Sequence, residues 1–383
     1  MEKIARFLEQ RDQDNLLRKL TPFNSRQKGL LKRENKEFID FSSNDYLGLS
    51  DHPRLKKAFN QAIDNFGVGS AASRLLSGDF KIFHELEERI AKFKGSQSAL
   101  IFNSGYQANL GIISSLSSRH DVIFSDKLNH ASIIDGMLLS GAKLFRFNHN
   151  DPEHLQYLLK KHRNKFRRSL IVSETVFSMD GDIAPVTDLV KLKQDYDCLL
   201  MVDEAHATGV FGETGGGILQ AQKVNSGVDL IMGTFSKGLG SFGAYLGCSK
   251  KMKTFLINSC RSFIYSTALP PAIIAANLAS LDVVEQEPQR RKTLLENADF
   301  FRKALKEKGL SIKGSSQIVP LILGSTKKAV SMSQELLKEG ILVFPIRPPT
   351  VPKNQARLRF SLTYNHNKEI LKKVINQISK ILS

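Results

Sequence analysis

The sequence predicts an α/β fold with a mostly parallel sheet in a large domain and a smaller α+β domain at the C-terminal end. Short apolar runs alternate with amphipathic segments through the middle of the chain, and the composition changes beyond them. The 383 residues also exceed the roughly 250–300 at which a single core stops growing. We therefore expect an N-terminal segment at 1–48, a large domain at 49–285 and a small domain at 286–383.

Six apolar runs are continuous rather than alternating in hydrophobicity, which is typical of strands buried on both faces of a parallel sheet. Helices are expected between them, one ending at Gly95 and another capped by Asp151 with Pro152 in its first turn. The pattern predicts helices on both faces of the sheet and functional residues just beyond the carboxyl ends of its strands. The six runs are 98–105, 121–126, 169–174, 198–204, 229–234 and 243–248.

The small domain is predicted to mix helices and strands. The first 48 residues contain a helix and a hairpin, which we expect to pack on this domain. The expected small-domain strands lie at 317–324, around 341–349 and at 356–363, with a helix at 330–340.

The chain carries 55 Lys+Arg against 38 Asp+Glu, a net charge of +17, which favours an anionic partner such as nucleic acid, an acidic carrier protein or a phosphorylated small molecule. The densest basic run, 160–168, has no accompanying aromatic platform or recognition helix. We interpret it as a solvated helix end and expect no nucleic-acid partner. A basic nucleic-acid-binding scaffold remains a remote alternative.

Several other classes are not expected from the sequence. Three widely spaced cysteines lack zinc or disulfide spacing, and the acidic and histidine residues of 149–154 read as helix-capping chemistry, so no metal site is predicted. Neither a membrane-spanning run nor an apolar signal core is present. We expect no membrane association and a cytoplasmic location.

The stretch GTFSKGLGSFG, residues 233–243, surrounds Lys237 with glycine and hydroxyl residues. Its last six residues match GxGxxG, but an apolar run follows instead of a helix, and 258–268 lack the acid that a dinucleotide fingerprint needs. A Walker A loop is also excluded, because Leu239 stands where its lysine belongs. The remaining interpretation is a nucleophilic, Schiff-base lysine that serves pyridoxal phosphate.

A pyridoxal phosphate site also needs a carboxylate for the ring nitrogen, a group that stacks on the ring, a partner for the ring oxygen and a phosphate cradle. Asp203 ends an apolar run and His206 follows three residues later. Asp203 alone could equally be a turn or helix cap. Backbone N–H groups at a strand-to-helix turn and nearby hydroxyls suit a phosphate. The cradle candidates are Gly105, Tyr106, Thr234 and Ser236.

Seven motifs, taken in sequence order, resemble the α-oxoamine synthase family of pyridoxal phosphate enzymes, and the resemblance runs from about Leu17 to the end. The resemblance implies a fold type I transferase. The motifs are FSSNDYLGLS (41–50), SGYQAN (104–109), DKLNHAS (126–132), VFSMDGD (176–182), DEAHATG (203–209), GTFSKG (233–238) and IRPPTVP (346–352).

The resemblance implies roles for individual residues. Lys237 would carry the cofactor and act as base at the substrate α-carbon, while Asp203 would keep the ring nitrogen protonated. His130 would stack on the ring, and His206 and Ser178 would contact the ring oxygen and imine region. The phosphate would be held by Gly105, Tyr106 and Thr234, with Ser236 a less secure addition.

Arginines suit the carboxylate of an amino-acid substrate because their fork is planar and bidentate. Arg359 matches the family's carboxylate-binding position. Arg347 and Arg357 are close in sequence, and strand alternation puts Arg357 on the same face as Arg359, so periodicity does not separate them. Arg18 and Thr350 match positions that bind the acyl substrate.

The implied reaction is a decarboxylative condensation of L-alanine with a pimeloyl thioester, carried on coenzyme A or acyl carrier protein, as in biotin synthesis. A sibling activity that joins glycine to a short acyl-CoA is the alternative. The segment 263–271 resembles one that reaches the phosphate from a second subunit, which implies a homodimer with shared active sites.

Overall fold

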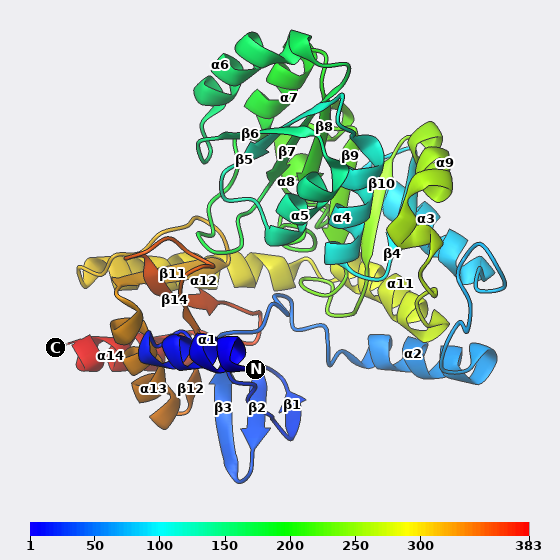
Figure 1. Ribbon diagram of the computed structural model, residues 1–383. Coiled ribbons are helices and arrows are strands. Elements are labelled where there is room, and N and C mark those ends of the chain that lie inside the picture. Colours follow the sequence, from blue (N-terminus) through cyan, green and yellow to red (C-terminus); the bar gives the residue numbers. More distant parts are fainter. Residues whose placement is uncertain (383) are drawn as a thin grey trace. The chain divides into compact units, whose positions relative to one another are not determined.

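The computed structural model describes residues 1–382, which form two compact units (Figure 1). Unit 1 comprises Met1–Gly48, Ser178–Asp182 and the chain from Lys292 onward, and unit 2 comprises Leu49–Phe177 and Ile183–Arg291. The short segment 178–182 lies within the predicted large domain, and no feature of its residues indicates that it belongs to the first of these units.

Unit 2 is built on a seven-stranded sheet with the order β4-β10-β9-β8-β7-β5-β6. Neighbouring strands from β9 to β6 pair in parallel, and β10 pairs antiparallel with both β9 and β4. The predicted, mostly parallel α/β fold is confirmed. The strands are β4 (Ser98–Phe102), β5 (Val122–Asp126), β6 (Lys143–Phe147), β7 (Ser169–Glu174), β8 (Leu199–Asp203), β9 (Leu230–Thr234) and β10 (Ala244–Cys248).

Two strands depart from the simplest expectation. The loop from Thr234 to Ala244 contains no crossover helix, so β10 returns antiparallel, since a parallel return needs a connection of a dozen or more residues. The sequence analysis missed β6, because its charged residues Lys143 and Arg146 are exposed. Among the strands of residues 1–382, β6 pairs with β5 alone, and charged side chains are typical of such an edge position.

Helices flank the sheet of unit 2 (Figure 1). The apolar side of α4, including Ala108, Ile112 and Leu116, packs in one buried cluster with side chains of the strands. As predicted, Gly95 ends α3 in the left-handed conformation and the Asp151 side chain caps α6. The α-helices are α2 (Pro53–Phe66), α3 (Lys81–Lys94), α4 (Gly105–Leu116), α5 (Ala131–Ser140), α6 (Pro152–His162), α7 (Val186–Asp195), α8 (Ile218–Gln222), α9 (Lys250–Ser259), α10 (Arg261–Ile264) and α11 (Pro271–Gln286), with 3-10 turns at Arg163–Lys165 and Asn225–Gly227.

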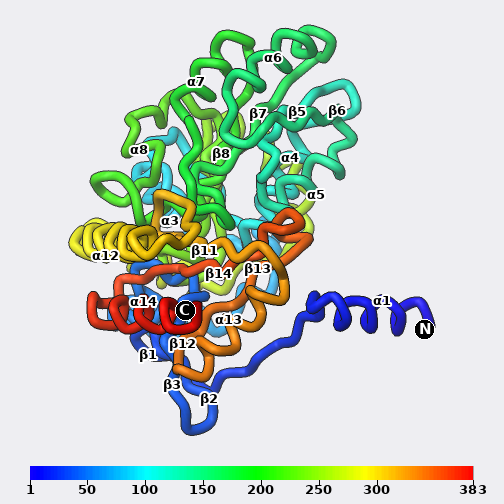
Figure 2. The backbone as a smooth tube through the Cα atoms, turned by 90° about the vertical axis from the view of Figure 1, so that its left-hand side faces the viewer, coloured from blue at the N-terminus to red at the C-terminus, as the bar shows by residue number. Residues whose placement is uncertain are grey.

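Unit 1 contains two smaller sheets, ordered β1-β2-β3-β12 and β11-β14-β13. The N-terminal hairpin joins β12 through parallel pairing with β3. Helix α1, by contrast, buries none of its residues and stands away from the sheets of this unit (Figure 2). The elements are α1 (Glu2–Gln13), β1 (Ser25–Gln27), β2 (Leu30–Arg33), β3 (Lys36–Asp40), α12 (Gln289–Glu307, entering from unit 2), β11 (Ile318–Gly324), α13 (Thr326–Lys338), β12 (Ile341–Leu342), β13 (Pro345–Ile346), β14 (Ala356–Ser361) and α14 (Lys368–Leu382).

Among residues 1–382, none of the helices combines the length and apolar character that crossing a bilayer requires.

A fully buried ion pair lies directly behind the carboxyl end of β8. The Lys94 ammonium donates to the Glu204 carboxylate and to the Gly216 carbonyl, and both charged side chains have 0% exposure. Glu204 Oε1 also accepts from the Leu219 N–H at 3.0 Å. These contacts tie α3 to the turn that follows β8 and to the start of α8.

We predict that Lys94→Met lowers the free energy of unfolding of unit 2 by about 3–5 kcal/mol, because it strands a buried carboxylate. The double variant Lys94→Met/Glu204→Gln should recover part of this loss. Lys81→Met on the same helix is the matched control, because its partner Glu85 lies 4.0 Å away at an exposed site. Calorimetric unfolding measures the difference, and equal effects of the two single substitutions would contradict it.

Candidate active site

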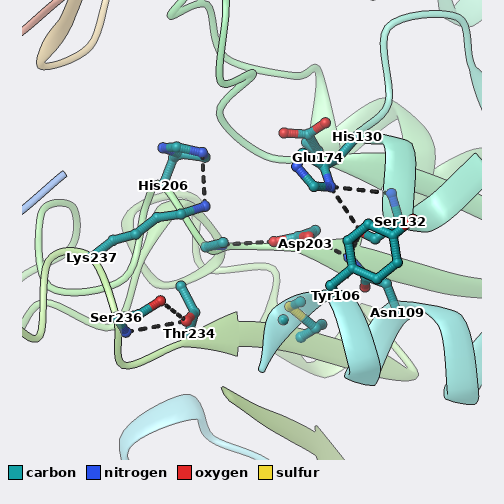
Figure 3. A pocket seen from close by; sticks show the side chains of 13 residues that line it. Tyr106, Asn109, His130, Ser132, Glu174, Asp203, His206, Thr234, Ser236 and Lys237 are labelled. Carbon is teal, nitrogen blue, oxygen red and sulfur yellow. Dashed lines mark hydrogen bonds between the residues drawn. The ribbon is translucent and has the colours of Figure 1, made fainter. Parts of the chain in front are cut away.

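A pocket of about 190 Å³ opens at the carboxyl ends of the parallel strands of unit 2 (Figure 3). The ends of β7, β8 and β9 and the first turns of α4 and α5 supply its walls. It is lined by Gly105, Tyr106, Asn109, His130, Ser132, Glu174, Asp203, Ala205, His206, Met232, Thr234, Ser236 and Lys237.

Lys237 and His206 meet in this pocket. Lys237 lies three residues beyond the end of β9, and its Nζ is 2.9 Å from Nε2 of His206, as Figure 3 shows. His206 is buried, whereas Lys237 is half-buried. The structure therefore places a primary amine within proton-sharing distance of an imidazole, at a position that a small ligand can reach.

The Asp203 carboxylate is fixed from two directions. Its Oδ1 accepts the Ala205 N–H at 2.8 Å, and its Oδ2 accepts from Asn109 Nδ2 at 2.9 Å. The first bond is the turn-capping role that was weighed from the sequence, and the second comes from α4. The same Asn109 amide group donates to Ser132 Oγ at 3.0 Å. Asp203 is thus a buried carboxylate with a set orientation at the pocket wall.

His130 is the N-cap residue of α5, and its Nδ1 accepts the Ser132 N–H at 3.2 Å. Burial in the pocket lowers the pKa of His130; the nearby Asp203 charge opposes this shift and Lys237 adds to it. The imidazole is therefore uncharged at neutral pH, and its edge lies toward Tyr106, with ring centroids 6.4 Å apart. An uncharged, oriented ring at the pocket wall can stack on a flat ligand.

The start of α4 and the end of β9 form an anion cradle. Ser104 caps α4 by accepting the Gln107 N–H, so the first-turn N–H groups at Gly105 and Tyr106 have no partner within the helix. Thr234 Oγ1 lies 2.7 Å from Ser236 Oγ. Backbone N–H groups at a helix start beside two hydroxyls suit a phosphate.

Glu174, which the sequence analysis did not single out, ends β7 and lines the same pocket. It is 3% exposed, and its Oε1 has no hydrogen-bond partner among residues 1–382. Burial raises the pKa of Glu174 to about 8, with the neighbouring Asp203 charge as the next cause. The pocket therefore holds two carboxyl groups in contrasting surroundings.

Asn109 and Glu174 were not predicted as site residues, although the sequence contains a signal for each of them. Asn109 lies four positions after Gly105, one helical turn along α4, inside the quoted motif SGYQAN. Glu174 ends a predicted strand adjacent to the one that carries Asp203. Applying the strand-end rule to every run would have found Glu174, whereas the Asn109–Asp203 bond depends on how α4 packs.

Ser178 and Arg359 belong to unit 1 and lie together there. The Arg359 Nε donates to the Ser178 carbonyl, and its Nη groups donate to Asn44 Oδ1 at 3.1 Å and to Tyr46 OH at 3.2 Å. Among residues 1–382, Arg359 forms no ion pair with an acidic side chain. Its positive charge is held in place by neutral acceptors.

Arg357 differs from Arg359 although both lie on β14. Its side chain has 0% exposure, and Nη1 donates to Asp180 Oδ1 at 2.9 Å and to the Met179 carbonyl at 3.1 Å. The charge of Arg357 is thus neutralised inside unit 1. This contrast favours Arg359 over Arg357 as the arginine available to an anionic ligand.

Arg18, Thr350 and Arg347 form another group in unit 1. Arg18 donates to Thr350 Oγ1 at 3.1 Å, and Arg347 donates to the Asn15 carbonyl. Burial lowers the pKa of Arg347, and the charges of Arg18 and Arg11 lower it further. The cluster is cationic and suits an anionic group.

The geometry also tests the dinucleotide-binding interpretation of residues 233–243. The residues after Gly243 form strand β10 rather than a helix, which removes the dinucleotide fingerprint. The chemistry that remains combines an amine, an imidazole, a fixed carboxylate and an anion cradle. Such a set can bind an anionic carbonyl compound covalently and move protons on it.

The family model described as "Aminotransferase class I and II" matches residues 36–378. A protein named 8-amino-7-oxononanoate synthase from Geobacter sulfurreducens is 48% identical over 381 residues, which cover 99% of this chain and 97% of that protein.

Solved structures show the same fold. A serine palmitoyltransferase from S. paucimobilis, with a bound PLP–myriocin aldimine, superposes with a TM-score of 0.93 and 29% identity over 99% of this chain and 96% of that one. An 8-amino-7-oxononanoate synthase from Francisella tularensis superposes with a TM-score of 0.78 and 34% identity, over 90% of this chain and 98% of that one.

Proposed function

Because the chain belongs to the class I and II aminotransferase family, we propose that it is a pyridoxal phosphate enzyme that condenses L-alanine with a pimeloyl thioester. The products are 8-amino-7-oxononanoate, CO2 and the free thiol of the carrier, coenzyme A or acyl carrier protein. The 48% identity with a full-length relative of that name supports the substrates. The observation that carries the chemistry is Lys237 beside His206, in a pocket with a fixed carboxylate and an anion cradle.

The pocket residues fit pyridoxal phosphate. The cradle of Gly105, Tyr106 and Thr234 suits the phosphate, and a Cβ added at Gly105 would lie 3.0 Å from the Met232 methyl group, so glycine keeps this wall open. The orphaned Oδ1 of Asn109 is a buried polar atom of the same pocket. When bound, the cofactor supplies an aldehyde that forms an imine with an amine and a ring that withdraws electrons from the substrate α-carbon.

Lys237 is proposed as the amine that binds the cofactor and, once displaced by substrate, as the base at the α-carbon. A lysine base must be neutral part of the time, and the adjacent His206 Nε2 can accept a proton from Nζ across 2.9 Å. Lys237 then returns the proton to the α-carbon after CO2 leaves, and the departing thiolate takes its proton from solvent, so that the overall reaction consumes one proton.

Asp203 is proposed to keep the pyridine nitrogen protonated. Its two hydrogen bonds, from Ala205 and Asn109, favour the ionised carboxylate and fix its direction. The proposed partners of the ring face and ring oxygen are His130, which is uncharged at neutral pH, and His206, which is buried. Ser178 is proposed to contact the imine region.

Substrate recognition is assigned to residues of unit 1. Arg359, whose charge has neutral partners, is proposed to bind the alanine carboxylate. Arg18 and Thr350 are proposed to bind the acyl substrate, and the cationic surroundings of Arg347 suit a pimeloyl chain because that chain ends in a second carboxylate.

We also propose a homodimer in which the segment 263–271 of each chain contributes to a shared site. Exposed apolar side chains on unit 2, among them Val68 at 82% and Leu76 at 79%, are of the kind that an interface covers. Tyr265, within the segment itself, is 73% exposed.

The substrate assignment is tested by product analysis. With L-alanine and pimeloyl-CoA, mass spectrometry should find 8-amino-7-oxononanoate, and glycine with acetyl-CoA should give less than about a hundredth of that rate, because a hydrophobic acyl chain and a carboxylate supply several kcal/mol of selectivity. Preferential formation of 2-amino-3-oxobutyrate would instead assign the sibling activity.

The lysine assignment gives a separate prediction. Lys237→Ala should remove the visible absorption of the bound cofactor, abolish the borohydride-stable adduct and reduce turnover by on the order of a thousandfold or more. Lys251→Ala, at an exposed position of α9, is the control and should keep all three. An adduct that maps to another lysine would overturn the assignment.

The two arginines of β14 should separate kinetically. Arg359→Ala should raise KM for alanine by about 10- to 100-fold, the value of a lost charge-assisted hydrogen-bonded pair. Arg357→Ala should chiefly lower thermal stability, because it removes the buried partner of Asp180 and leaves that carboxylate with the half-exposed Lys313 at 3.4 Å. If Arg357→Ala raises KM while Arg359→Ala lowers only stability, the roles are reversed.

A further inference from the structure

Glu174 has no part in the chemistry described above, although it lines the pocket. The residue is only 3% exposed, and its Oε1 lacks a hydrogen-bond partner within residues 1–382. A buried polar atom without a partner carries a free-energy cost that asks for a reason. The inference below rests on the proposed function only in assigning this pocket to the cofactor and substrate.

The strand register places Glu174 beside Asp203. Strands β7 and β8 are parallel, and Glu174 and Asp203 are register partners at their ends. Partners on neighbouring strands project to the same face of the sheet, about 5 Å apart. Figure 3 shows both side chains at the pocket. Two carboxylates at this spacing in a buried site do not both ionise readily, so one of them retains a proton near neutral pH.

The hydrogen bonds decide which carboxyl group keeps the proton. Asp203 accepts two N–H groups, from Ala205 and Asn109, and both favour its ionised form. The backbone N–H of His130 lies near Glu174 and lowers its pKa only slightly against the effect of burial, and Glu174 Oε1 has no donor among residues 1–382. We propose that Glu174 and Asp203 are a carboxyl pair that shares one proton, carried by Glu174, whose O–H group is offered to the pocket.

The charges that face Glu174 come from three other elements. Asp203 at the end of β8 and Asp126 at the end of β5 favour the neutral acid, whereas Lys237, beyond β9, favours ionisation. His130 caps α5 nearby and is uncharged at neutral pH, and Tyr106 and His206 line the same pocket. The net result raises the pKa of Glu174 to about 8, with burial as the largest cause.

A neutral Glu174 has two consequences for the site. The pocket wall then carries one negative charge instead of two, and this charge lies at Asp203, the proposed partner of the pyridine nitrogen. The acid also offers a hydrogen-bond donor to a carboxylate or carbonyl oxygen of a bound substrate, which an ionised carboxylate would repel. Glu174 is therefore a positioning residue of the site, and it loses this property above about pH 8.

Linkage gives a test with a definite sign. In the unfolded chain a glutamate ionises near pH 4.3, so the folded protein binds one more proton between about pH 4.3 and 8. Stability from this group is complete below the lower value and is lost as the pH rises toward about 8. The melting temperature of the full-length, cofactor-saturated parent, measured relative to Glu174→Gln, should therefore fall from pH 5 to about pH 8 and then level off.

A difference in melting temperature that is constant over this range would overturn the proposal. The variant Asp203→Asn tests the pairing itself, because removal of the neighbouring charge should let Glu174 ionise at lower pH. The melting temperature of Asp203→Asn, measured relative to the double variant Asp203→Asn/Glu174→Gln, should also fall as the pH rises. This fall should end at a pH at least one unit lower than it does in the parent. An unchanged end point would show that the two carboxyl groups are independent.

Two further readouts do not depend on activity. The first is the dissociation constant of pyridoxal phosphate, measured for the parent and for Glu174→Gln and expressed as a ratio. This ratio should vary by less than about twofold between pH 6.5 and 7. It should change by at least about threefold by pH 9.5, because only the parent gains a charge. If the glutamine variant fails to fold, infrared titration of the parent decides: a protonated carboxylic acid band at pH 6.5 that disappears above pH 8 is expected, and its absence at pH 6.5 refutes the proposal. Failure of the condensation reaction with normal titration would count against the proposed function alone.

Discussion

The buried carboxylate of Asp203 is the constraint around which the pocket of unit 2 is arranged. A charge in such a place is tolerated only with donors directed at it, and these come from the turn after β8 and from Asn109 on α4. Helix α4 must therefore begin at Gly105, which brings Asn109 to Asp203 one turn later and leaves the first N–H groups facing the pocket. The anion cradle and the fixed carboxylate are two results of one helix placement.

Glu204, the residue that follows Asp203, has a structural role outside the pocket. Asp203 faces the pocket, whereas Glu204 is fully buried against Lys94 and the N–H of Leu219. A Cβ on Gly217 would lie 2.5 Å from both Glu204 oxygens, so the turn approaches this carboxylate too closely for a larger residue. The buried ion pair holds the strand end from behind, and the position of Asp203 follows from it.

Much of this arrangement could be predicted from the sequence, because buried parallel strands leave continuous apolar runs and their ends gather functional residues. Lys237, Asp203 and His206 were found in this way, and all three line one pocket. Strand β6 escaped notice because an edge strand needs no apolar run. Glu174 escaped notice because residues 175–177 after it include neither the glycine nor the histidine that marked the strand ends near Lys237 and Asp203. The neutral state proposed for Glu174 depends on Asp203, its register partner on the neighbouring strand. The pairing of two strands cannot be deduced from the sequence of either strand alone.

The two arginines of β14 show the same limit in unit 1. Alternation puts Arg357 and Arg359 on one face, so strand periodicity does not distinguish them. The segment 178–182 makes them different, because it brings Asp180 to Arg357 and the Ser178 carbonyl to Arg359. Both arginines are buried, but one guanidinium is thereby paired with a carboxylate, and the other has neutral acceptors. Since the segment belongs to unit 1, Ser178 and Arg359 are held as one group, and the segment that pairs Asp180 with Arg357 also orients Arg359, the residue proposed above to bind the substrate carboxylate.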